Sequence, residues 1–170
     1  GRALFQANVR AEARDVDAVA TQLAAIDGGP LRLVQPDWTR GGVLYHLAHA
    51  AALVGDAPLG TSVYELLRPY DGQLLLFACT HVPASAAHAL ALAAAGAGDM
   101  TTAIAHFEGA IEFEDSLGAR VLAARSRLAL AELLLPADPP RAQVFAADAH
   151  AAANDLGMTN VQARAEAIIT

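Results

Sequence analysis

The sequence contains no lysine, and this absence already excludes one class of site. All 11 of its basic residues are arginine. The phosphate-binding loop of many nucleotide hydrolases requires a Gly-Lys-Ser/Thr sequence, so this chain has no such loop. The arginines are scattered singly along a chain whose formal net charge is −7. We therefore expect this segment neither to hydrolyse nucleotides nor to bind nucleic acid directly.

Thiols and long apolar runs are also scarce. The single cysteine, Cys79, cannot form an internal disulfide and lacks the second thiol of a metal site. We interpret it as a small buried hydrophobe, although His81 lies at the spacing of a thiol-imidazole pair. The longest apolar run, 89–98, is about half the length that spans a bilayer. Since no charged-then-apolar leader begins the chain, we expect no membrane association and a cytoplasmic location.

The sequence motifs of common catalytic sites are missing as well. The sequence has no His-Glu-x-x-His helix and no Gly-x-Ser-x-Gly elbow. His46 and His49 could share a metal, but no carboxylate or thiol lies at ligand spacing beside them, which favours a packing role. We predict no catalytic residue, no metal and no cofactor in this segment. An all-helical enzyme centred on the histidine pair is the alternative.

The chain does contain one short sequence motif three times, which we call the repeated phrase. It consists of a Leu-Ala pair, a short run, and a small residue followed by aspartate. The three copies are Leu47-Ala48 to Gly55-Asp56, Leu90-Ala91 to Gly98-Asp99, and Leu128-Ala129 to Ala137-Asp138. Recurrence at about forty residues is typical of helical-hairpin arrays, in which each hairpin buries its apolar face by stacking on its neighbours. Such arrays bind partners.

An apolar stripe at helical spacing follows each aspartate. The stripes are Gly60, Tyr64 and Leu67, then Ala103, Phe107 and Ala110, then Ala142, Ala146 and Ala149. Small residues at a helix crossing let two backbones approach closely, and an aromatic residue fills the gap between neighbouring hairpins. We therefore expect Phe107 to be buried between hairpins.

The stretch 98–111 resembles the inter-helix turn and second helix of a tetratricopeptide repeat. The repeated aspartates lie farther apart than the consensus repeat length of about 34 residues, so the connections between helices are longer than in the consensus. The resemblance implies an all-α, tetratricopeptide-like, right-handed superhelical solenoid with essentially no sheet. We predict one repeat domain over 1–170, with helical hairpins at about 3–27, 37–69, 83–118 and 120–157 and a capping helix at 159–169.

Two local features of this arrangement are also predicted. Asp37 should cap the first helix of the second hairpin, and Trp38 should staple its start, with ligand stacking as the alternative. The apolar run 73–79 fits either a strand or a buried connector. We favour a connector packed into the groove of the solenoid.

In a tetratricopeptide stack the first helices line a concave groove. The residues two before and two after each repeated leucine would form its wall: Tyr45, His49, His88, Leu92, Ser126 and Leu130. Such a wall suits an extended peptide, a partner helix or a small amphipathic effector, unless segment 74–77 fills the groove. A second set, the acidic residues Glu108, Glu112, Glu114 and Asp115, could bind a cation or a basic partner. We favour a solvated helix face for this set.

Beyond the generic repeat, four runs look like the carboxy-proximal repeat region of large actinobacterial regulators. These runs are 64–70, 105–120, 124–131 and 153–158. The regulators concerned are LuxR-type and adenylyl-cyclase-like proteins that join a signal-transduction ATPase to a tetratricopeptide-like tail. The resemblance implies that this chain is a fragment of a larger protein and serves as a sensor, partner-binding or autoinhibitory scaffold. A free-standing adaptor that binds peptides in its groove is the alternative.

Overall fold

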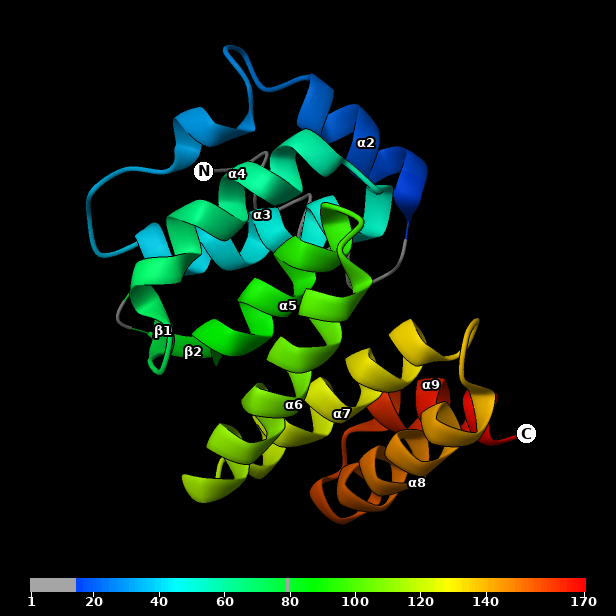
Figure 1. Cartoon of the computed structure of the whole chain (residues 1–170). Helices are drawn as coiled ribbons and strands as arrows, with labels where there is room; N and C mark the ends of the chain where they lie inside the picture. The colour runs from blue at the N-terminus through cyan, green and yellow to red at the C-terminus, as the bar shows by residue number, and fades with distance from the viewer. Residues whose placement is uncertain (1–14, 79) are drawn as a thin grey trace. The chain divides into compact units, whose positions relative to one another are not determined.

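The computed structural model describes residues 15–78 and 80–170, and these residues are mainly α-helical (Figure 1), as predicted. The helices are α2 (Val16–Ala24), α3 (Arg40–Val54), α4 (Ala57–Leu67), α5 (Ala86–Gly96), α6 (Met100–Ser116), α7 (Arg120–Leu134), α8 (Pro139–Leu156) and α9 (Thr159–Ile169). Two 3₁₀ turns, Pro30–Leu33 and Arg68–Tyr70, complete the helical elements. The first helix of hairpin 3–27 and Cys79 lie outside the described residues. No helix in the described ranges is both long and apolar enough to cross a bilayer.

The prediction of essentially no sheet is wrong for one segment. Strand β1 (Leu74–Phe77) pairs antiparallel with β2 (His81–Ser85), placing Leu75 opposite Ala84. Segment 73–79 therefore contains a strand and is not the connector that we favoured. Leu75 is buried while its neighbours Leu74 and Leu76 are exposed, and this alternation is the period of two of a strand with one face on the core.

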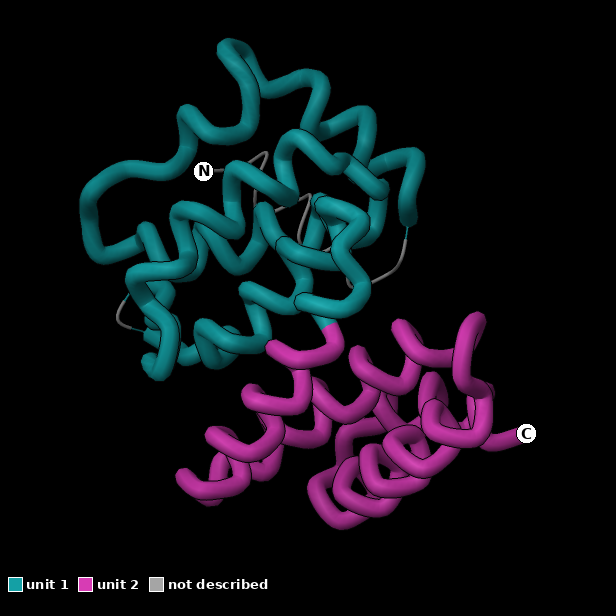
Figure 2. Tube along the Cα trace, in the orientation of Figure 1, with its two compact units in different colours: residues 1–103 teal, residues 104–170 magenta. Residues whose placement is uncertain are grey.

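The chain divides into two compact units, which we call unit 1 (1–103) and unit 2 (104–170) (Figure 2). Unit 1 contains α2 to α5 and the β-hairpin, and unit 2 contains most of α6 together with α7, α8 and α9. The single repeat domain over 1–170 stays a prediction.

The aspartates of the repeated phrase begin the second helix of each hairpin. In all three copies the carboxylate accepts a hydrogen bond from the backbone amide three residues later, which satisfies an otherwise orphan donor of the first turn. The pairs are Asp56 with Leu59 (3.0 Å), Asp99 with Thr102 (3.0 Å), and Asp138 with Arg141 (3.2 Å). The aspartates recur because each caps a helix.

In two of the three copies the glycine before the aspartate closes the end of the first helix. Gly55 and Gly98 adopt positive φ angles of 70° and 86°. The amide of the following aspartate then donates to the carbonyl five residues back, as Asp56 does to Ala51 at 3.1 Å, which is a Schellman closure. The third copy has no glycine, and its Asp138 amide donates only four residues back, to Leu134 at 2.8 Å.

The same three-helix arrangement recurs in both units. In unit 1, α5 packs against both α3 and α4, and in unit 2, α9 packs against both α7 and α8. A β-carbon at Gly60 would lie 2.5 Å from the amide nitrogen of Ala97, and one at Gly96 would lie 2.8 Å from the carbonyl carbon of Ala51. The crossings in unit 1 are therefore backbone to backbone, which only glycine permits.

The predicted apolar stripes are buried with one exception. All stripe residues after Asp99 and Asp138 are buried, and Phe107 is 1% exposed. In the first stripe Gly60 and Leu67 are buried, while Tyr64 is only half-buried. The stripe of α8 consists of alanines, so this helix approaches its neighbours through methyl groups.

The start of α3 differs from the prediction. The N-cap is Thr39 and not Asp37, whose carboxylate instead accepts from the Thr39 amide at 2.8 Å and from its hydroxyl at 2.6 Å. These bonds, the hydroxyl bond foremost, lower the pKa of Asp37 below its ordinary value. Trp38 is 63% exposed and therefore does not staple the helix start.

Candidate functional site

Three of the predicted groove residues meet in unit 1. The Tyr45 ring on α3 lies 6.1 Å from the His49 ring and 6.2 Å from the His88 ring of α5, measured between centroids. Tyr45 is 2% exposed and His88 6%, whereas His49 and Leu92 are half-buried. The predicted positions around each leucine therefore bring Tyr45, His49 and His88 together, but Tyr45 and His88 are buried inside unit 1.

The cluster extends to rings that were not among the predicted groove residues. His46 lies 5.2 Å from Tyr45 and 5.4 Å from Phe77, and Phe77 lies 5.5 Å from His81, with edge-to-face geometry in each case. A β-carbon at Gly42 would lie 2.1 Å from the Phe77 ring, so this glycine makes room for it. Strand β1 thus packs on α3 through Phe77. Edge-to-face rings of this kind stabilise packing.

The histidine pair has no third metal-ligating side chain beside it in the part of the chain that the structure describes. Among the described residues, no group of three or more His, Cys, Asp or Glu side chains could hold a metal ion. His46 is 8% exposed and faces Tyr45 and Phe77. The contacts of His46 are those of a core residue, which is the role favoured from the sequence.

The other two predicted groove residues, Ser126 and Leu130, lie on α7 in unit 2 and are fully buried. The Ser126 hydroxyl donates to the Glu114 carboxylate at 2.7 Å, and Glu114 is fully buried as well. A partner would reach these side chains only after unit 2 had opened locally. The binding role of the six groove residues stays a prediction.

The interpretation of the acidic set as a solvated face is wrong for Glu114 because this residue is buried. Glu108 forms an ion pair with Arg141 of α8. Asp115 holds Arg127 of α7 through two bonds, of 2.6 and 3.3 Å. Glu112 is exposed, as expected. Glu108, Glu114 and Asp115 therefore tie α6 to α7 and α8.

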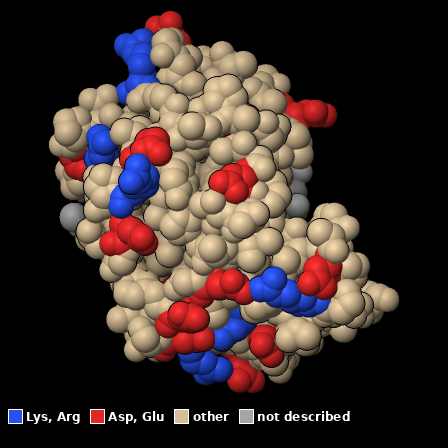
Figure 3. All heavy atoms as spheres, in the orientation of Figure 1, with Lys and Arg blue, Asp and Glu red and all other residues tan. Residues whose placement is uncertain are grey.

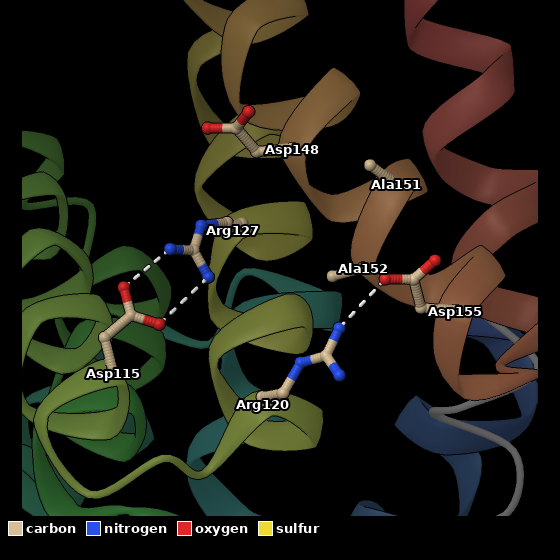
Figure 4. Close-up of a pocket in the computed structure, with 7 residues that line it drawn as sticks. All are labelled: Asp115, Arg120, Arg127, Asp148, Ala151, Ala152 and Asp155. Carbon is tan, nitrogen blue, oxygen red and sulfur yellow. Dashed lines mark hydrogen bonds and ion pairs between the residues drawn. The ribbon is translucent and has the colours of Figure 1, made fainter.

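Unit 2 carries a surface hollow of about 450 Å³, which we call the charged hollow (Figure 4). Its lining comes from three helices: Asp115 of α6, Arg120 and Arg127 of α7, and Asp148, Ala151, Ala152 and Asp155 of α8. Arg120 Nη2 donates to Asp155 Oδ2 at 3.0 Å. Figure 4 shows this pair at one side of the hollow and the Asp115–Arg127 pair at the other.

The charged hollow was missed from the sequence although a weak signal was present. Arg120 and Arg127 are seven residues apart, as are Asp148 and Asp155, so each pair lies on one face of its helix. In the described residues, the ion pairs engage both arginines and leave Asp148 without a cationic partner. The hollow thus has three carboxylates against two guanidinium groups.

Comparison with protein-family models, with curated proteins and with solved structures gave no significant match.

Proposed function

We propose that this chain is a tetratricopeptide-like repeat module that binds a protein or peptide partner. The observation that carries this proposal is the recurrence of one three-helix arrangement, α3, α4 and α5 in unit 1 and α7, α8 and α9 in unit 2. In repeat proteins each repeat packs mainly on the neighbouring repeats, and the stack of repeats offers an extended surface for partners. The shared aspartate caps support the assignment of both hairpins to one repeat type.

The wider setting that we propose is a multidomain LuxR-type regulator acting in the cytoplasm. The family resemblance of runs 105–120 and 124–131 is the basis for this step. Nucleotide hydrolysis, cyclase activity and DNA binding would then belong to other domains of the parent. This module would serve as its sensor, partner-binding or autoinhibitory scaffold and would not itself be an enzyme.

The alternative from the same repeat architecture is a free-standing adaptor. The parent open reading frame separates the two. A phosphate-binding loop encoded upstream, or a helix-turn-helix encoded downstream, supports the regulator, whereas a start codon immediately before Gly1 supports the adaptor.

The interaction role is tested by peptide selection. A random peptide library is displayed on phage and selected against the purified chain, and the selected peptides are titrated by calorimetry beside scrambled peptides of equal composition. Saturable binding of a selected peptide and not of its scrambled control is the expected result. Failure to select any such peptide, together with ATP turnover by the purified chain, would contradict the proposal.

A further inference from the structure

We propose that the charged hollow of unit 2 binds a basic side chain, arginine or lysine, of a peptide partner. This inference rests on the proposed interaction function and names the chemistry of the partner. It concerns α6, α7 and α8 and does not involve the predicted groove residues.

The two ion pairs define the sides of the hollow. Asp115 receives both terminal nitrogens of Arg127, a geometry that fixes the guanidinium plane. The Arg127 side chain is 20% exposed, so packing also holds it in place. Arg120 is held to Asp155 from the other side. Because the ion pairs engage both arginines of the lining, the hollow offers an anionic ligand no unpaired cation among the described residues that line it.

Asp148 supplies the unused charge. It lies on α8 beside Ala151 and Ala152, and Figure 4 shows its carboxylate at the edge of the hollow with no ion pair to the residues drawn. The two alanines leave room above the helix, where the alkyl stem of an arginine or lysine can rest on their methyl groups while its charged end meets Asp148. The surplus carboxylate therefore favours a cationic group.

Long-range charge points to the same partner. The chain carries a formal net charge of −7, and acidic side chains flank the arginines over the surface of unit 2 (Figure 3). An acidic protein attracts a basic peptide before contact, and complementary charge contributes to association rate and specificity. The hollow would then select for the basic residue within a longer bound segment.

The test uses the whole chain and two labelled peptides. Both are fluorescein-labelled Gly/Ser nonapeptides, with three central arginines in one and three citrullines in the other. Citrulline keeps the shape of arginine and lacks its charge. Fluorescence anisotropy measures binding, and amide chemical shifts of Ala151 and Ala152 report its location. We expect the arginine peptide to bind, to shift both amides and to weaken with added salt, and the citrulline peptide to bind at least about fivefold more weakly.

Two variants and one control locate the effect. Asp148→Asn should weaken the arginine peptide about fivefold, because an exposed ion pair contributes at most about 1 kcal/mol. Ala151→Leu, at an exposed helix position, should also weaken binding because the larger side chain occupies the hollow. Glu112→Gln removes the same charge from an exposed site outside the hollow and should leave the affinity unchanged. Circular dichroism checks that each variant keeps its helices.

Equal binding of the two peptides, or equal weakening by Asp148→Asn and Glu112→Gln, would overturn the assignment. Shifts confined to amides outside the charged hollow would overturn it too. In these cases a library-selected peptide that still binds the chain would leave the interaction function standing, so the two failures are distinguishable.

Discussion

Unit 1 and unit 2 share the capped helical hairpin but hold their helices together by different means. In unit 1 the backbones meet at Gly60 and Gly96, and rings from α3, α5 and the β-hairpin pack together. In unit 2 the stripe of α8 is alanine, and four ion pairs join different helices: Glu108–Arg141, Asp115–Arg127, Arg120–Asp155 and Glu132–Arg164. The ion pairs described in unit 1, Asp27–Arg32 and Glu65–Arg68, are local.

The difference shows that helical hairpins with the same sequence pattern can be held together by close backbone packing or by ion pairs. A backbone crossing tolerates no added atom, because the neighbouring helix cannot move away cheaply. An exposed ion pair tolerates changes in volume but is screened by salt. We therefore expect unit 1 to be sensitive to side-chain size and unit 2 to depend more on ionic strength.

The largest expected effect tests whether charge or apolar burial dominates unit 2. Phe107→Ala should cost about 3–5 kcal/mol of unfolding free energy, because it empties a fully buried aromatic site. Chemical denaturation measures this loss. Leu117→Ala, at an exposed position, is the control and should change little. A Phe107→Ala protein as stable as the parent would show that the apolar stripe does not hold α6 in place.

The second prediction concerns the backbone crossing of unit 1. Gly60→Ala should cost about 1–3 kcal/mol because its β-carbon would overlap the backbone of residues 96–97. Gly109→Ala in α6 is the matched control, since a β-carbon there meets nothing within 4 Å. In that open position alanine should stabilise the helix by up to about 1 kcal/mol. Thermal unfolding compares the two variants, and a gain of stability in both would remove the contrast between the units.

The third prediction addresses the ion pairs of unit 2. Arg164 contacts Glu132 through bonds of 3.0 and 2.8 Å, and both side chains are more than two-thirds buried. A double-mutant cycle with Glu132→Gln and Arg164→Met should give a coupling of about 1 kcal/mol, smaller in 1 M salt. The same cycle at Glu65 and Arg68, both more exposed, should give about 0.3 kcal/mol. Equal couplings at both sites would show that the two units do not differ in this respect.

The smallest expected effect is a pH dependence at the α5–α6 connection. The Thr102 hydroxyl, and then its amide, donate to Asp99 and lower the pKa of that carboxyl below 3.8. A lowered folded-state pKa gives stability that is present above 3.8 and is lost as the pH falls through the folded-state value. Carboxyl carbon shifts followed by NMR measure this pKa. Thr102→Ala should raise it toward 3.8, and an unchanged titration would contradict the assigned cause.

Local chemistry explains what could be predicted from the sequence. Helix ends depend on bonds that span three to five residues, so the turns at Gly55-Asp56 and Gly98-Asp99 recur in the sequence as one phrase that needs no tertiary information to be found. The stripe containing Phe107 was predictable for a similar reason, since helical periodicity alone fixes which side chains share a face. The β-hairpin was not, because an apolar run as short as 74–77 fits a strand and a buried connector equally well.

The candidate site depended on distant pairings. In the charged hollow Arg120 meets Asp155 across 35 positions, and elsewhere in unit 2 Arg164 meets Glu132 across 32. Such partners are set by how helices pack. Glu114 illustrates the same limit, because its acidic neighbours suggested a solvated face while packing against Ser126 buried it. The sequence pattern of the charged residues indicates which of them share a helix face, but it does not indicate which residues of the neighbouring helices lie opposite that face.

The self-contained helix connections have a consequence for the order of events during synthesis. Each aspartate cap and each glycine closure is complete within a few residues of its turn, so neither requires a helix that has yet to be made. Contacts that are short in sequence form quickly and with little loss of chain entropy. As the chain leaves the ribosome, the turn at Gly55-Asp56 can therefore close before α5 emerges. The long ion pairs of unit 2, in contrast, must wait for α8 and α9 and are added last.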